Sequence, residues 1–166
     1  MSFQIKDIVV YSHRGQRRVL PLKTGELNII TGSSKTGKSA LIEIMDYCLG
    51  AGECRIPEGI IRETVSWVAL RLEVTDGMTF IARKVPEPSR AASSDVYYLV
   101  GKDLEIPSFN QLSKNINSDA LEGILTELTG IENNKHQVPE GQTRLPLSAQ
   151  VRHSLFYCFQ AQEEVI

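Results

Sequence analysis

The chain has 166 residues, a formal net charge of −2 and 42% hydrophobic residues, values typical of one soluble globular domain. This composition disfavours a disordered, collagen-like or coiled-coil chain, and the near-neutral charge provides no general attraction for a polyanion. No apolar run approaches the roughly 20 residues that a membrane-spanning helix needs, and the charged N-terminal segment is typical of a strand rather than a signal peptide. We therefore expect a cytoplasmic protein that does not enter the membrane.

The first 50 residues predict a β-hairpin, a short strand and a helix, in that order. Apolar-rich runs at 3–11 and 17–22 flank a polar turn and indicate the hairpin. Residues 27–31 form a short apolar run consistent with a buried strand. After a glycine-rich segment, the apolar residues between 41 and 48 recur at helical spacing, and Gly50 marks the expected end of that helix.

The middle of the chain changes to a period of two. Between 65 and 85 apolar residues alternate with charged ones, and Asp76-Gly77 is a strong signal for a two-residue hairpin. Residues 86–94 have the composition of a flexible surface loop, and 96–100 predict another strand. Strand patterns on both sides of the glycine-rich segment predict a mixed sheet that includes an antiparallel layer.

The last third predicts a helix, a long loop and an apolar run. A helix is expected over 110–130, with Ser118 as its N-cap and Gly130 at its end. Residues 132–147 are polar and lack a period, which indicates a long loop. The apolar run at 155–159 has the character of a strand that ends at a glutamine.

The glycine-rich segment carries the sharpest chemical signal. Residues 32–39 match the P-loop pattern GxxxxGK(S/T), and an apolar run leads in while a helical pattern leads out. That arrangement allows successive backbone N–H groups and a helix N-terminus to surround a phosphate. Lys38 would contact the β/γ-phosphate oxygens, and the Ser39 hydroxyl would ligate Mg²⁺. The predicted ATP-binding residues here are Gly32, Ser33, Ser34, Lys35, Thr36, Gly37, Lys38, Ser39 and Ala40.

Catalysis needs more than a phosphate-binding loop. A P-loop hydrolase also requires an acidic residue at the end of a buried strand, and no recognisable Walker B segment occurs. The nearest match to a guanine-recognition segment, at 134–137, lacks its final acid. The candidates for a kinase lid, Arg83, Lys84 and Arg90, lie on an antiparallel pattern, so GTPase and small-molecule kinase chemistry are both disfavoured.

Other reactive side chains predict no further site. Three cysteines without metal-ligand spacing are expected to be reduced thiols, and three scattered histidines are treated as ordinary residues. Basic residues gather at 14–23 and again at 83–90. Each group is either a solvated strand face or a contact for nucleotide phosphate or nucleic acid.

The P-loop and its flanks resemble a known family. Residues 27–32 followed by 37–44 resemble the N-terminal half of ABC-type ATPase heads of the structural-maintenance-of-chromosomes, RecF and RecN group. Residues 46–50 and 155–162 are also similar to an uncharacterised bacterial subfamily of ABC-three-component systems, which would connect the chain with DNA repair or phage defence.

The resemblance implies an α/β fold, the N-lobe of a P-loop NTPase, with a mixed sheet, an antiparallel β subdomain and helices. It divides the chain into a hairpin and P-loop unit at 1–60, an antiparallel unit at 61–106, and a helical segment, loop and Q-loop at 107–166. By resemblance Gln160 is the Q-loop glutamine and a second Mg²⁺ ligand, with Gln162 as its competitor, and Arg14 lies near the nucleotide. Lys35 departs from the family, which usually has glycine there.

The same resemblance implies partners. Family members complete the head with a C-terminal half that supplies the signature motif and the Walker B carboxylate, and two heads pair around ATP. The expected function is therefore Mg-ATP binding, with hydrolysis only in the complete ATPase and with DNA as a possible ligand. A compact P-loop kinase or NTPase and a non-hydrolysing nucleotide-binding module are the alternatives.

Overall fold

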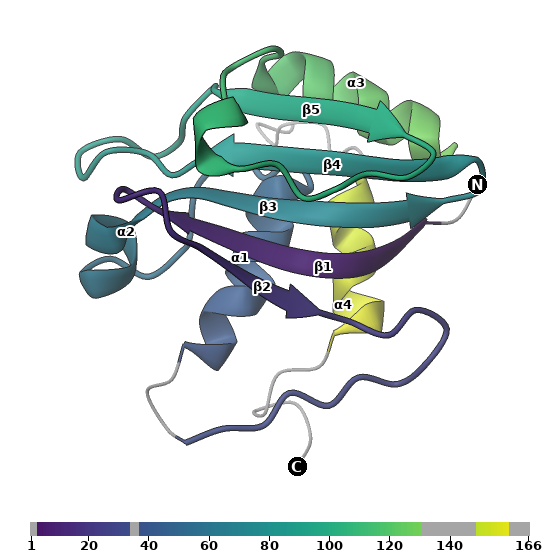
Figure 1. The fold of residues 1–166 in the computed structure, drawn as a ribbon, viewed down its shortest axis with the longest axis horizontal. Coiled ribbons are helices and arrows are strands. Elements are labelled where there is room, and N and C mark those ends of the chain that lie inside the picture. The colour runs from purple at the N-terminus through teal and green to yellow at the C-terminus, as the bar shows by residue number, and fades with distance from the viewer. Residues whose placement is uncertain (1–2, 34–36, 131–148, 160–166) are drawn as a thin grey trace, which may run out of the picture.

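The computed structural model describes residues 3–33, 37–130 and 149–159, which form a mixed α/β fold around one antiparallel sheet of order β2-β1-β3-β4-β5 (Figure 1). The strands are β1 (Phe3–Ser12), β2 (Arg17–Pro21), β3 (Val65–Val74), β4 (Gly77–Lys84) and β5 (Val96–Gly101). The helices are α1 (Lys38–Cys48), α2 (Ile60–Thr64), α3 (Ser118–Thr129) and α4 (Leu155–Cys158), with 3₁₀ turns η1 (Phe109–Gln111) and η2 (Val151–Ser154). None of the helices in the described ranges is long and apolar enough to cross a membrane.

Both predicted hairpins are confirmed. β1 pairs with β2, and β3 pairs with β4 in a register that places Val74 opposite Gly77. Gly77 has a φ of 144°, and a Cβ added there would lie 2.7 Å from the carbonyl oxygen of Gly101. Only glycine fits this turn, because a side chain would be strained by the backbone angle and would collide with the neighbouring backbone.

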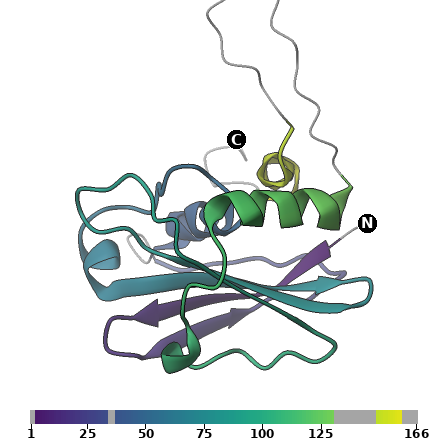
Figure 2. The same cartoon turned by 90° about the horizontal axis from the view of Figure 1, so that it is seen from above.

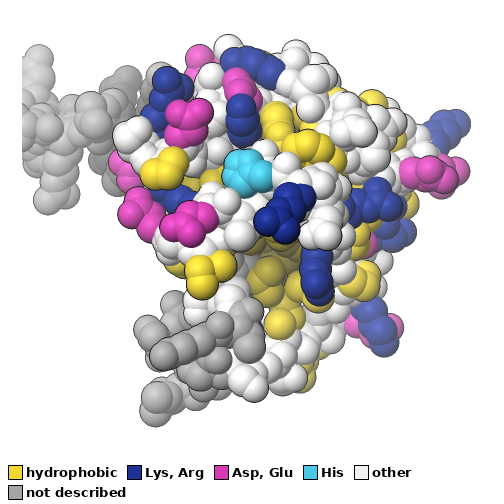
Figure 3. Space-filling view, turned by 60° about the vertical axis from the view of Figure 1, so that its left-hand side comes forward, with side chains coloured by type: hydrophobic (Ala, Val, Ile, Leu, Met, Phe, Trp, Pro, Cys, Tyr) yellow, Lys and Arg dark blue, Asp and Glu magenta, His cyan; other side chains and the backbone are white. Residues whose placement is uncertain are grey.

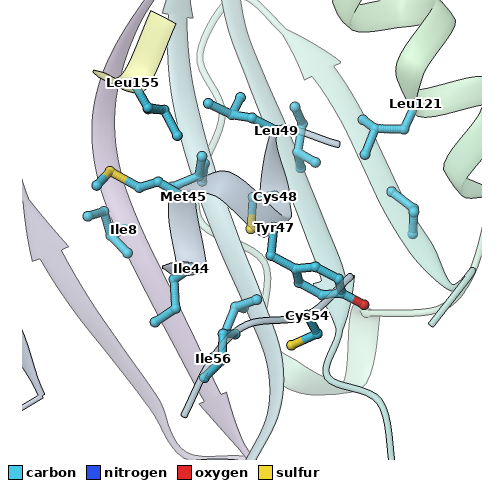
Figure 4. Packing of buried hydrophobic residues seen from close by; sticks show 14 of the residues in the cluster. Ile8, Ile44, Met45, Tyr47, Cys48, Leu49, Cys54, Ile56, Leu121 and Leu155 are labelled. Atoms are coloured by element: carbon cyan, nitrogen blue, oxygen red, sulfur yellow. The ribbon is translucent and has the colours of Figure 1, made fainter. Parts of the chain in front are cut away.

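One face of the sheet is covered by helices, as the view from above shows (Figure 2). Val68, Leu70 and Leu72 of β3 point to this face, as their alternation predicts, and all three are buried. Figure 4 shows residues of α1 on the sheet, with Leu155 on one side of them and Leu121 on the other. The core of the molecule therefore lies between the sheet and α1, with α3 and α4 at its margin.

The other face is covered by residues 102–112, which are extended except for the single 3₁₀ turn η1 (Figure 2). The Tyr11 hydroxyl donates to the carbonyl of Pro107 at 2.7 Å, and Arg71 Nη1 donates to the carbonyl of Leu104 at 2.8 Å. Apolar side chains of the segment pack on a cluster that includes Trp67 and Phe80. These contacts explain why the segment is extended: its carbonyls accept side-chain donors from the sheet instead of forming helical bonds.

The prediction of a helix starting at residue 110 is wrong in its boundary. Helix α3 begins at Ser118, and its N-cap is Asn117, whose Oδ1 accepts from the backbone N–H of Ala120 at 2.8 Å. Gly130 ends the helix in the left-handed conformation, as predicted. The expected loop at 132–147 lies outside the described residues.

The prediction of a buried strand at 27–31 is also wrong for this structure. The segment is not in a strand, and the side chains of Leu27 and Ile29 are 86% and 77% exposed. Asn28 fixes the preceding turn, because its side chain accepts from the backbone N–H of Lys23 and donates to the Lys23 carbonyl, both at 2.8 Å. A strand needs a neighbour for its backbone groups, and no described strand pairs with this segment.

Two further predictions, a mixed sheet and a strand at 155–159, are also wrong for the described residues. The sheet is not mixed, because every pairing among the described strands is antiparallel. The apolar run at 155–159 is not a strand but the helix α4, which follows directly from η2. Leu155 is buried against the cluster that contains Met45, so packing on α1 accounts for its apolar character.

The two edges of the sheet are formed by β2 and β5. Pro21 sits near the end of β2 and provides no N–H group for another strand. At the opposite edge, the Asn115 side chain accepts from the backbone N–H of Tyr98 at 2.8 Å and donates to its carbonyl at 2.7 Å. These two bonds occupy backbone groups of β5 that another strand would otherwise pair with.

A buried ion pair links β1 to β3 and yields a stability prediction. Arg71 Nε lies 2.6 Å from Asp7 Oδ2, and Asp7 is only 3% exposed. Replacing Asp7 with asparagine leaves a largely buried guanidinium without its counter-charge, so Asp7→Asn should lower the free energy of unfolding by about 3 kcal/mol. Chemical denaturation measures it, with the exposed Glu73→Gln as control; equal stabilities of the two variants would contradict the role of the pair.

Candidate functional site

The described part of the P-loop brings Gly32 and Ser33 next to the start of α1. The helix begins at Lys38, and its N-cap is Gly37, with a φ of 83°. A glycine accommodates this left-handed backbone without strain, and no atom lies within 4 Å of a Cβ placed there. Since the N-cap has no side chain, it cannot itself cap the first N–H groups of the helix. Ser34, Lys35 and Thr36 lie outside the described residues.

The Lys38 side chain folds back over the loop that precedes its own helix. Its Nζ donates to the carbonyl of Gly32 at 2.6 Å and to the carbonyl of Ser33 at 2.7 Å. These are charge-assisted hydrogen bonds, which are stronger than those between neutral groups. The ammonium therefore closes the loop by joining its first two residues to the helix N-terminus.

Ser39 and Ala40 have different accessibility. Ser39 is exposed, so its hydroxyl is open to a ligand or to a metal ion. Ala40 is buried, and its backbone N–H donates to the carbonyl of Gly37 at 3.1 Å. The structure thus brings five predicted residues together at one helix end: Gly32, Ser33, Gly37, Lys38 and Ser39, with Ala40 beneath them.

Arg14 lies in the turn between β1 and β2, where it is exposed. Within the described ranges, no hydrogen bond or ion pair joins it to the P-loop. The turn is fixed locally, because the Ser12 Oγ accepts from the backbone N–H of Gln16 at 3.1 Å. The proximity of Arg14 to a nucleotide therefore remains a prediction.

A hollow of about 440 Å³ lies beside this hairpin, where β1 and β2 meet the end of α2. Val10 and Val65 supply apolar lining, and Arg18 is the register partner of Val10 on the same face of the sheet as α1. Figure 3 shows this side of the molecule, where hydrophobic side chains lie in a depression bordered by Lys and Arg. The other lining residues are Ser12, Gln16, Arg17 and Thr64.

The predicted Q-loop residues Gln160 and Gln162 lie outside the described residues. The segment that precedes them is held against α1: Arg152 Nη1 lies 3.5 Å from Asp46 Oδ1. Gln150 Nε2 also donates to Glu122 of α3 at 3.0 Å. Burial, together with the nearby Asp46 carboxylate, raises the pKa of Glu43 on the same helix. These contacts place the end of the described chain on the P-loop helix.

Neither Arg83, a candidate kinase-lid residue, nor a cluster of metal-binding side chains provides a second site in the described ranges. Arg83 is buried beneath α1, where it cannot serve as a mobile lid residue. Within the described ranges no group of three His, Cys, Asp or Glu side chains could hold a metal ion. His153 has a structural contact, since its Nδ1 accepts from the backbone N–H of Gln150 at 3.1 Å.

Compared with models of protein families, with curated proteins and with solved structures, the chain gives no significant match. The class that the fold itself defines is a mixed α/β protein with a five-stranded antiparallel sheet. The resemblance to ABC-type ATPases therefore rests on the sequence of the P-loop and of the residues around it.

The three cysteines differ in environment, and this difference can be measured. Cys48 and Cys54 are buried and Cys158 is exposed, all as free thiols. Burial raises the pKa of the Cys48 thiol to about 12, so almost no thiolate is present at neutral pH. A maleimide should label Cys158 alone in the folded chain, since the thiolate is the nucleophile, and label all three after unfolding. Cys158→Ser should abolish the native signal; native labelling of Cys48 at the same rate would contradict the packing of α1.

Proposed function

We propose that the chain binds Mg-ATP at the P-loop and is the ATP-binding N-terminal portion of an ABC-type ATPase of the SMC/RecF/RecN kind. The observation that carries this proposal is the arrangement of Lys38 and Ser39 on the first turn of α1, after the left-handed Gly37. The sequence pattern requires a loop that ends at a helix N-terminus, and this segment has that local geometry.

The residues present fit the phosphates of a nucleotide. The Lys38 ammonium already donates hydrogen bonds to two carbonyl oxygens, and phosphate oxygens with full charge would compete for the same donors. Backbone N–H groups at the start of α1 and the positive end of the helix dipole add to the attraction. Binding thus exchanges loop carbonyls for phosphate oxygens around one ammonium.

Ser39 is the metal-binding candidate in the described chain. Its exposed hydroxyl adjoins Lys38 at the helix N-terminus, which suits a Mg²⁺ ion shared with phosphate oxygens. When bound, Mg²⁺ neutralises charge that develops on the phosphate oxygens. Gln160 is the proposed second protein ligand, assigned by resemblance alone.

The basic hairpin is the proposed location for the rest of the nucleotide. Its hollow joins apolar Val10 and Val65 with Arg18 and hydroxyl groups, a combination that suits a flat ring beside a sugar. The hollow lies on the α1 face of the sheet, which is the face that carries the P-loop helix. Arg14, at the tip of the same hairpin, is proposed to contact the nucleotide.

The exposed apolar segment at 27–31 supports the proposal that a protein partner covers it. Leu27 and Ile29 present large aliphatic side chains to solvent from a backbone that Asn28 holds in place. Burying each of these side chains would contribute about 1.5–3 kcal/mol. We propose that a C-terminal half of the same ATPase covers this segment with strands that also supply the Walker B carboxylate, and that two completed heads pair around ATP. DNA stays a possible further ligand.

The contribution of Lys38 to affinity can be tested by substitution. Lys38→Ala removes the ammonium, and charge-assisted contacts of about 1.5–3 kcal/mol each are lost, so Mg-ATP binding should weaken at least about tenfold. Isothermal calorimetry measures the change. Lys23→Ala is the matched control, because Lys23 is exposed and pairs only with Glu26 at 3.4 Å among its ion pairs. Equal affinities for Lys38→Ala and the unmodified chain would remove the P-loop from the proposal.

Hydrolysis needs groups beyond the P-loop. The chain offers Lys38, Ser39 and, by resemblance, Gln160, but its sequence has no recognisable Walker B carboxylate. Without that group the isolated chain should release phosphate at no more than about a hundredth of the complete ATPase rate, the lower end of what one acid–base group contributes. Adding the C-terminal half should restore turnover, and Gln160→Ala should then reduce the rate more than the affinity.

Phosphate release is measured on the purified chain, with Lys38→Ala as the control for contaminating ATPases. Robust release that depends on Lys38 and needs no partner would favour the compact kinase or NTPase instead. ATP binding without any turnover, even with the C-terminal half present, would favour the non-hydrolysing module.

A further inference from the structure

Arg83 of β4 is a buried cation whose partners are backbone carbonyls. Its side chain is 1% exposed, and within the described ranges no carboxylate forms an ion pair with it. Nη1 donates to the carbonyls of Tyr47 and Ala51, at 2.6 and 2.7 Å, and Nη2 donates to the carbonyl of Ser93 at 3.2 Å. The guanidinium also lies over the Tyr47 ring, 3.8 Å from its centroid.

These partners explain how the charge is tolerated. Tyr47 is in the last turn of α1, where the helix dipole provides a partial negative charge, and the ring face adds a cation–π contact. A buried charge without such compensation would be strongly unfavourable. Arg83 of the sheet therefore binds the C-terminal end of α1 through hydrogen bonds and a cation–π contact. An aliphatic side chain at this position could contribute packing alone.

Tyr47 is held at its other end as well. Its hydroxyl donates to the carbonyl of Lys84 at 3.1 Å and accepts from the backbone N–H of Ser93 at 3.0 Å. The carbonyl and the hydroxyl of one residue thus fasten the end of α1 to β4 and to the loop that follows β4. Arg83 and Tyr47 together form what we call the α1 anchor.

The rest of α1 is held less firmly. Of its five buried residues, four lie at positions 44–48, and only Ala40 lies in the first turn. Figure 1 shows the N-terminal end of the helix extending past β2, away from the sheet. An 11-residue helix is roughly 16 Å long, so a tilt of about 5° at the anchored end moves the first turn by more than about 1 Å.

We propose that Arg83 is a positioning residue for the nucleotide site: by holding the C-terminal end of α1, it sets where Lys38 and Ser39 lie. The inference rests on the proposed binding of Mg-ATP at the P-loop. Arg83 itself touches no phosphate, because it is buried at the opposite end of the helix. Its effect on binding passes through the orientation of α1.

The experiment compares variants that lose similar stability in different places. Arg83→Met keeps an unbranched side chain but removes the donors, and Phe80→Leu opens space in the cluster on the opposite face of the sheet. Mg-ATP affinity is measured by calorimetry at a temperature where thermal unfolding curves show every variant folded. Arg83→Met should weaken binding about tenfold, and Phe80→Leu should change it less than about twofold.

Two further variants separate anchoring from folding. Arg83→Lys keeps a donor for the carbonyls of Tyr47 and Ala51 and should recover part of the affinity. Tyr47→Phe removes only the hydroxyl contacts and should have a smaller effect, which can be measured even if Arg83→Met does not fold. A loss of stability in these variants with unchanged Mg-ATP affinity would overturn the proposal.

Hydrogen exchange distinguishes failure of the anchor from failure of the proposed function. Without nucleotide, Arg83→Met should accelerate exchange of amides across α1, while Phe80→Leu should not. Unchanged exchange in α1 overturns the anchoring role whatever the chain binds. If the unmodified chain does not bind Mg-ATP, both the proposed function and the positioning role fall, and accelerated exchange then identifies a purely structural anchor.

Discussion

The packing of the last turn of α1 against the sheet is the contact on which the arrangement of the molecule depends. Met45 and Cys48 enter the apolar core there, and Tyr47 meets the buried guanidinium of Arg83. The helix joins the glycine-rich loop at one end to the sheet at the other, so the position of a ligand held by the loop would depend in part on this contact. A protein interior is close-packed and transmits displacement, which makes such a contact a point of control as well as of stability.

The two faces of the sheet differ in the residues that line them and in what covers them. The helix face is lined mainly by aliphatic residues, and the Arg83 cation buried there is bound by carbonyls at a helix end. The opposite face carries aromatic residues and is covered by residues 102–112, whose carbonyls accept donors from Tyr11 and Arg71. Because backbone polar groups must be paired when buried, an extended covering segment needs such donors from the sheet. At the edges, Pro21 lacks an N–H group and Asn115 binds the backbone of Tyr98, and the exposed segment at 27–31 has no strand beside it among the described residues.

Residues 27–31 show where prediction from local sequence pattern fails. The hairpins at Gly15 and Gly77 were predictable because turn residues and alternation act between neighbours in sequence. The apolar run at 27–31 has strand character, but a strand forms only beside another strand, and that neighbour is not among the described residues. The prediction of a strand at 155–158 was wrong for a different reason. Four apolar residues suit a strand or a helix turn equally, and packing on α1 favours the helix.

The sequence by itself determined the local chemistry: the P-loop pattern with Lys38 and Ser39 at a helix start, the period-two strands, and the glycines at left-handed positions. These follow from spacing and backbone angles within a few residues. Only the tertiary structure decided that Arg83 is a buried clamp rather than a surface cation, that Asp7 meets Arg71, and that Asn28 holds a turn instead of joining a strand. Those roles depend on partners from 5 to 64 positions away, and a charged or polar side chain carries no local sign of whether such a partner exists.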